Sequence, residues 1–145
     1  MKYFIKERQP TQANMRNAAN KARIDVETIL SEIGFQEIKV VVPFKEKKSI
    51  VNTVGEHICN YFIWKKQLST LKEKDILLIQ FPIKTHTVFF NIILNKLKKK
   101  KVCVIFLIHD LEKLRYVNSK NYPMKKKIRM YFEETLFLKK ADYII

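Results

Sequence analysis

The chain of 145 residues is long enough for one domain with a sizeable core, and its apolar content of 47% excludes an intrinsically disordered chain. Its formal charge of +15 indicates a polyanionic or phosphorylated partner, without choosing among nucleic acid, acidic lipid and small phosphorylated molecules. Only two glycines occur, Gly34 and Gly55, which excludes the glycine-rich loops that cradle phosphates in GxGxxG and Walker motifs.

The predicted location is the cytoplasm. The two cysteines, Cys59 and Cys103, are too few for a disulfide framework or a zinc site. The N-terminus has no long apolar stretch and no small-residue cleavage site, which argues against a secretory signal. The longest apolar run is far shorter than the roughly 20 residues that a membrane-spanning helix needs.

The first third of the chain predicts a strand, a helix and a second strand. The strand covers Lys2 to Ile5, and a polar stretch leads to a helix that Asn14 caps and Gly34 ends. The second strand covers Phe35 to Val42. Helical spacing relates the apolar residues expected on the buried face of this helix: Met15, Ala18, Ala19, Ala22, Val26, Ile29, Leu30 and Ile33.

Three further strands and three further helices follow. Ser49 is the expected cap of the second helix, and Pro123 opens the fourth, which runs to about Lys140. The strands cover Asp75 to Phe81, Val102 to Ile108 and Tyr143 to Ile145. The second helix is expected to bury Ile50, Val51, Val54, Ile58, Tyr61 and Phe62, and the third, over residues 85–99, to bury Val88, Phe89, Ile92, Ile93 and Leu97.

Strands that alternate with helices of this length predict parallel pairing through right-handed crossovers. The expected fold class is therefore α/β, a Rossmann-like parallel sheet with flanking helices. No repeat, low-complexity linker or second domain interrupts residues 1–145.

The strongest functional candidates follow the apolar strand that ends at Ile108. Its continuous apolar run predicts burial on both faces, as is typical of parallel sheets. His109 and Asp110 come directly after it, at the carboxyl edge where open α/β sheets bind ligands. A histidine there can act as a base towards a substrate hydroxyl, with a neighbouring carboxylate raising its basicity. A histidine that only closes the turn is about equally consistent with the position. A metal phosphohydrolase built on this pair is disfavoured, because the remaining histidines lie in different settings.

Two further segments follow strands at the same predicted edge. Gln80 and Pro82 end the third strand, where the Gln80 amide could bond a sugar hydroxyl, although an ordinary strand exit is favoured from the residues alone. The loop after the first strand contains Arg8, Thr11 and Asn14, and it leads into a helix N-terminus, which favours anions. A plain capped loop fits that segment about as well.

Basic residues gather at the end of the third helix, where Lys96, Lys98, Lys99, Lys100 and Lys101 occur. A solvated helix end that complements the dipole is the favoured interpretation, and attraction to an anionic membrane face is the alternative. Trp64, beside Tyr61 and Phe62, is expected to belong to an aromatic stripe that faces the core, and an interfacial or homo-oligomer contact through Trp64-Lys65-Lys66 is the alternative. No nucleic-acid-binding signature accompanies the lysine runs.

The strand-end segments together resemble a family. Ile79-Gln80-Phe81-Pro82, then Val104 to Arg115 with its Ile-His-Asp-Leu-Glu core, and finally Ala141 to Ile145 resemble the N-terminal half of bacterial glucosyltransferase-3-like and galactofuranosyltransferase-like enzymes. The resemblance covers the last three strands well and the N-terminal helix only by pattern.

The resemblance implies the N-terminal, acceptor-side half of a GT-B glycosyltransferase. Such an enzyme moves glucose, galactose or galactofuranose from a UDP-sugar to a glycan or glycoprotein, without a metal ion, and its C-terminal nucleotide-sugar domain is expected beyond Ile145. His109 or Asp110 would position or deprotonate the acceptor. The implied substrate-binding edge comprises Arg8, Thr11, Asn14, Gln80, Pro82, Glu112 and Arg115. The rival hypothesis is a stand-alone basic module that binds nucleic acid or an anionic membrane surface without catalysis.

Overall fold

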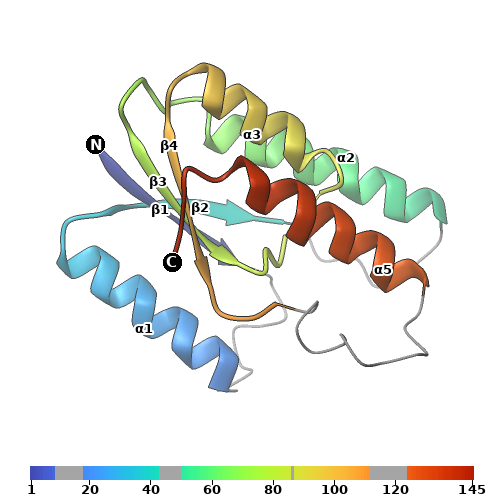
Figure 1. Ribbon diagram of the computed structural model, residues 1–145, viewed down its shortest axis with the longest axis horizontal. Coiled ribbons are helices and arrows are strands. Elements are labelled where there is room, and N and C mark those ends of the chain that lie inside the picture. The colour runs from blue at the N-terminus through green and yellow to red at the C-terminus, as the bar shows by residue number, and fades with distance from the viewer. Residues whose placement is uncertain (9–17, 43–49, 86, 112–123) are drawn as a thin grey trace.

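A computed structural model of the chain describes residues 1–8, 18–42, 50–85, 87–111 and 124–145. The described part is α/β, with parallel strands and helices that alternate along the chain (Figure 1), so the predicted Rossmann-like sheet is confirmed. The elements are β1 (Lys2–Arg8), α1 (Ala18–Glu32), β2 (Gln36–Val41), α2 (Ile50–Gln67), β3 (Ile76–Phe81), α3 (Phe90–Lys99), β4 (Cys103–Ile108), α5 (Met124–Met130), the π-helix η2 (Tyr131–Phe137), the 3₁₀-helix η3 (Leu138–Lys140) and β5 (Tyr143–Ile144).

The sheet has the strand order β2-β1-β3-β4-β5, so the winding reverses between β1 and β3. β1 pairs with β2 as far as Arg8, but with β3 only over Lys2 to Phe4. β3 continues along β4 as far as Phe81. The carboxyl halves of β1 and β3 therefore diverge at the switch point, where sheets of this kind bind ligands.

The two faces of the sheet are covered unequally. α2, α3 and η2 lie on one face, where Val104 and Phe106 of β4 are fully buried against them. α1 packs on the opposite face, over Phe4 and Leu78 (Figure 1). On that side β4 is only partly buried, which differs from the burial on both faces that its apolar sequence predicts, because α1 is the only described helix there.

The buried face of α1 differs from the predicted stripe. Leu30 is buried as expected, but Ile29 and Ile33 are more than half exposed. Arg23 and Glu27 take the inward positions one turn apart, so charged side chains complete the face that was expected to be apolar. The predicted end of the helix is confirmed at Gly34, whose φ of 85° lets the Phe35 N–H reach the Leu30 carbonyl at 2.9 Å.

The buried faces of α2 and α3 are also rotated from the predicted ones. α3 begins at Phe90, after a turn, and buries Phe90, Ile93, Leu94 and Leu97. α2 buries Asn60, Trp64 and, just past its end, Leu68. The expected inward residues Val54, Ile58, Phe62, Val88, Phe89 and Ile92 are exposed instead.

Trp64 shows why these helices take the observed rotation. Its ring is fully buried at 4.8 Å from the Phe90 ring, and its Nε1–H donates to the Thr85 carbonyl at 2.9 Å. A buried indole needs such an acceptor. The large aromatic group thus fixes the inward face of α2, and the core-facing interpretation of Trp64 is confirmed.

The orientation of α1 can be tested at two neighbouring aliphatic residues, Leu30, which is buried, and Ile29, which is exposed. Leu30→Ala should lower the free energy of unfolding by about 2–5 kcal/mol, because it removes buried methyl groups. Ile29→Ala should change it by less than about 0.5 kcal/mol, because that side chain is exposed. Urea unfolding of the two variants measures both values, and a larger loss for Ile29→Ala would contradict the observed rotation.

Candidate functional site

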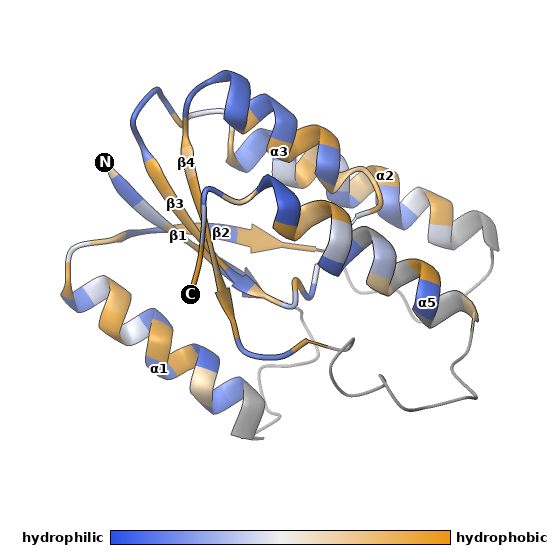
Figure 2. Ribbon diagram, in the orientation of Figure 1, coloured by the Kyte–Doolittle hydropathy of each residue, from blue (hydrophilic) through white to orange (hydrophobic). Residues whose placement is uncertain are grey.

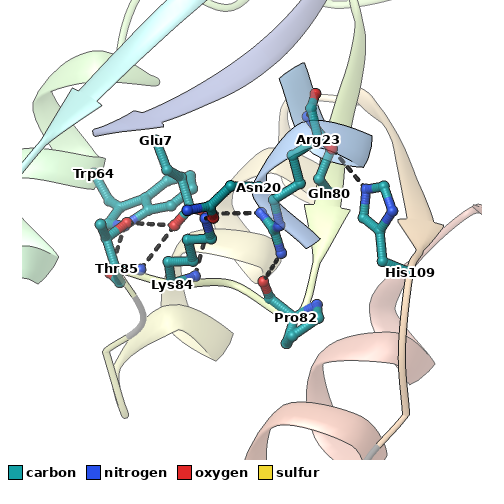
Figure 3. Close-up of polar contacts among 9 residues, drawn as sticks. All are labelled: Glu7, Asn20, Arg23, Trp64, Gln80, Pro82, Lys84, Thr85 and His109. Atoms are coloured by element: carbon teal, nitrogen blue, oxygen red, sulfur yellow. Dashed lines mark hydrogen bonds and ion pairs between the residues drawn. The ribbon is translucent and has the colours of Figure 1, made fainter. Parts of the chain in front are cut away.

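The candidate site lies where β1 and β3 diverge, at the carboxyl edge of the sheet. β1 contributes Glu7, α1 contributes Arg23, and β3 and the residues after it contribute Gln80, Pro82 and Thr85 (Figure 3). The separation of the two strands leaves a gap that polar side chains fill. Their hydrogen bonds replace the ladder bonds that the diverging strands no longer exchange.

Glu7 is the centre of this network. Its Oε1 accepts from the Thr85 N–H at 2.8 Å and from the Thr85 hydroxyl at 2.6 Å. Its Oε2 accepts from the Lys84 N–H at 3.2 Å and lies 3.3 Å from Arg23 Nη1. The carboxylate is therefore well satisfied although its side chain is only 5% exposed, as a buried charge must be.

Arg23 links α1 to the end of β3. Its guanidinium donates to the Pro82 carbonyl as well as to Glu7 (Figure 3). Burial lowers the pKa of Arg23, and the charges of Glu7 and Glu27 oppose that effect. Burial likewise raises the pKa of Glu27, although Arg8 lies 3.2 Å from its carboxylate and counteracts the shift.

Gln80 sets the protonation pattern of His109. The Gln80 amide nitrogen donates to the Arg23 main-chain carbonyl at 3.4 Å, so its oxygen faces His109 Nε2 at 2.6 Å. An amide oxygen only accepts, so Nε2 of His109 must donate the proton in this hydrogen bond. In the neutral ring Nδ1 is then the nitrogen with a lone pair, which is the atom that a base uses.

The surroundings of His109 disfavour a positive charge on the ring. Partial burial lowers its pKa, and the positive charges of Arg23 and Lys84 lower it further. Lys84 is held nearby by a 2.6 Å bond from its Nζ to Asn20, and burial lowers its own pKa. The His109 N–H donates to the Phe81 carbonyl at 2.9 Å and thereby extends the pairing of β3 with β4.

The structure brings together part of the predicted site. Gln80, Pro82 and His109 share one network at the strand ends, and Asp110 follows His109 directly. Arg8 is the last residue of β1, where it pairs with Glu27 rather than with the network around Glu7. Four predicted residues lie outside the described residues: Thr11, Asn14, Glu112 and Arg115.

Sequence reasoning missed the charged centre of the site, formed by Glu7, Arg23, Lys84 and Thr85. Glu7 comes two residues after the predicted first strand, which was the available signal, but a carboxylate at a strand end is equally expected to face solvent. Arg23 lies on a helix whose apolar residues suggested a different buried face. Its bond to Pro82 joins residues 59 positions apart, which no local pattern reveals.

The predicted lysine cluster is divided between two roles. Lys100 Nζ donates to the Ser69 and Leu71 carbonyls, and Lys101 contacts Glu73 at 3.0 Å, so both tie the end of α3 to the turn before β3. Lys96 instead reaches Tyr61 on α2. Among the described residues, no three His, Cys, Asp or Glu side chains are grouped to hold a metal ion, and no described helix is long and apolar enough to cross a membrane.

Comparison with known proteins agrees with the resemblance carried by the strand ends. Residues 2–145 match the family described as glucosyltransferase 3-like, N-terminal domain. The chain belongs to this family. No curated protein matches the chain. The matched range contains every described helix and strand.

Removal of the Glu7 carboxylate tests how far the strand-end network depends on it. Glu7→Ala should lower the free energy of unfolding by about 3–5 kcal/mol, because it leaves Arg23 buried without its partner. Glu37→Ala is the matched control, since it removes the 2.6 Å pair with Lys6 at the surface and should cost at most about 1 kcal/mol. Equal losses in a denaturant titration would show that the Glu7 pair has no special role.

Proposed function

We propose that this domain forms the acceptor side of a GT-B glycosyltransferase. The complete enzyme moves a hexosyl group, glucose, galactose or galactofuranose, from a UDP-sugar to a glycan or glycoprotein acceptor. Membership of the glucosyltransferase 3-like family supports the reaction class. The observation that carries the role of this domain is the hydrogen bond from His109 Nε2–H to Gln80, which leaves Nδ1 as a base at the sheet edge.

The proposed step is a proton transfer at the acceptor. Nδ1 of His109 accepts the proton of an acceptor hydroxyl as the hydroxyl oxygen forms a bond to the anomeric carbon of the donor sugar. The bond from that carbon to the UDP oxygen breaks, and UDP leaves with the electron pair. A lowered His109 pKa suits this role, because it favours the unprotonated ring that a general base needs.

The donor side belongs in a second domain under this proposal. Gly34 ends α1, and Gly55 is exposed on α2, so neither glycine lies at the strand ends around His109. A close backbone cradle for a pyrophosphate usually needs several glycines beside a strand end. We therefore propose that the UDP contacts belong to this second domain, and that His109 and Asp110 face the acceptor.

The rival hypothesis, a basic binding module without catalysis, has less support. The family match favours a transferase domain. The buried network around Glu7 also builds a defined group of side chains at the sheet edge, whereas binding to a polyanion needs only surface charge.

Transfer assays with the full-length gene product test the role of His109. His109→Gln should lower kcat by about 10²- to 10⁴-fold with a much smaller effect on donor KM, because a general base acts in the chemical step. His57→Gln, a change on α2 away from the strand ends, should leave kcat within about twofold. Unchanged turnover in His109→Gln would remove the proposed base.

The pH profile gives a second test of the same step. The active form of His109 is the neutral ring, so kcat/KM should fall as the pH decreases through its pKa and should be flat above it. Burial, Arg23 and Lys84 lower this pKa. The decline in kcat/KM should therefore be centred at a pH below about 6.5, the usual pKa of histidine. A decline centred above that range would contradict the assignment.

A further inference from the structure

Apolar side chains lie exposed on the outer side of the helix layer, away from the strand-end site. They belong to α2, to the turn before α3 and to α3 itself. Phe62 is 57% exposed and Ile92 is 45% exposed. We define the α2–α3 surface by the exposed residues Val54, Ile58, Phe62, Val88, Phe89 and Ile92. Sequence periodicity predicts that all six of these residues are buried. The core of the domain buries other faces of the two helices, so it does not explain why these six are apolar.

The α2–α3 surface is continuous across the two helices, which lie side by side (Figure 1). The partly buried ring of Tyr61 joins them, with the Phe62 ring at 5.4 Å and the Phe89 ring at 6.0 Å. The Thr87 hydroxyl donates to the His57 carbonyl at 2.7 Å and fixes the turn before α3 against α2. These contacts connect the exposed groups of α2 with those at and before α3.

Lysine side chains border this apolar surface. Lys65 Nζ lies 5.9 Å from the centre of the Phe62 ring, and Lys96 Nζ lies 6.0 Å from that of Tyr61. The last turns of α2 and α3 add Lys66, Lys98 and Lys99, and Figure 2 shows this end of α3 as strongly hydrophilic. The single acidic residue of these two helices, Glu56 on α2, lies outside their last turns.

The apolar centre and the cationic border of the α2–α3 surface together favour one kind of partner over another. A second copy of the chain would bring the lysines of both surfaces together, in a protein that already has a formal charge of +15. An anionic bilayer instead pairs lipid headgroups with the ammonium groups and accepts Phe62 and Ile92 among the acyl chains beneath. Aromatic side chains are also favoured at that depth.

We propose that the α2–α3 surface docks the protein on the anionic face of a lipid bilayer. The two helices lie flat in the interface, as amphipathic helices do when they bind without crossing. The strand-end site lies at the edge of the sheet and not on this helix face, so docking leaves His109 accessible. The proposal does not depend on the glycosyltransferase assignment.

Vesicle flotation tests the proposal with vesicles of equal parts phosphatidylcholine and phosphatidylglycerol, compared with pure phosphatidylcholine. The wild-type protein should bind the anionic vesicles and not the neutral ones. Phe62→Ser combined with Ile92→Ser should weaken binding by about tenfold, because the apolar contribution is lost. Lys65→Gln combined with Lys96→Gln should weaken it by about twenty-five-fold at low salt, at about fivefold per lysine.

Matched controls use the opposite face of the sheet. Ile29→Ser combined with Ile33→Ser, and Lys2→Gln combined with Lys21→Gln, remove the same kinds of side chain from exposed positions beside α1 and should leave binding within about twofold. Circular dichroism confirms that each variant is folded.

Two results would overturn the proposal. Equal weakening by the lysine control pair would show attraction by net charge alone, and equal weakening by the isoleucine control pair would show that binding does not use the α2–α3 surface in particular. A dimer in light scattering that Phe62→Ser with Ile92→Ser dissociates, with vesicle binding unchanged, would assign the surface to a second copy of the chain.

Discussion

The arrangement of the candidate site depends on one buried ion pair, between Glu7 at the end of β1 and Arg23 on α1. The two strands that flank the switch point exchange ladder bonds only at their amino ends, so their carboxyl ends need another link. Glu7 supplies it through Thr85 and Lys84, and Arg23 supplies it through Pro82. A buried pair of this kind contributes little net stability against an apolar pair, but it defines one geometry, because either charge alone would be costly to bury.

The Glu7–Arg23 pair affects His109 in two ways. The main chain of Arg23 orients the Gln80 amide, which in turn fixes the proton on His109 Nε2. The guanidinium of Arg23 and the ammonium of Lys84 also disfavour a positive charge on the ring. Position, tautomer and charge of the proposed base thus follow from the same side chains that hold β1, α1 and β3 together. The family assignment supports the proposed reaction class, and this network supports the proposed role of the domain within it.

The sequence predicts the order of elements and the edge of the sheet well, because apolar strands and the residues that end them are local signals. Gln80, Pro82 and His109 were placed at one edge for this reason. The inward faces of α1, α2 and α3 were not predictable in the same way. Each helix has apolar residues on more than one side, and the choice rests on distant partners, such as the Thr85 carbonyl for Trp64 and the Glu7 carboxylate for Arg23. The observed rotation of α2 and α3 leaves exposed the residues of the α2–α3 surface, which we propose to dock on a membrane.

The central claim is that the network holds His109 as a neutral base with Nδ1 available. Nitrogen-15 NMR of the histidine rings measures this most directly, because the shifts of the two ring nitrogens distinguish both tautomers and the charged form. At neutral pH, His109 should show a protonated Nε2 and an unprotonated Nδ1. A proton on Nδ1 alone, or a doubly protonated ring at that pH, would contradict the account.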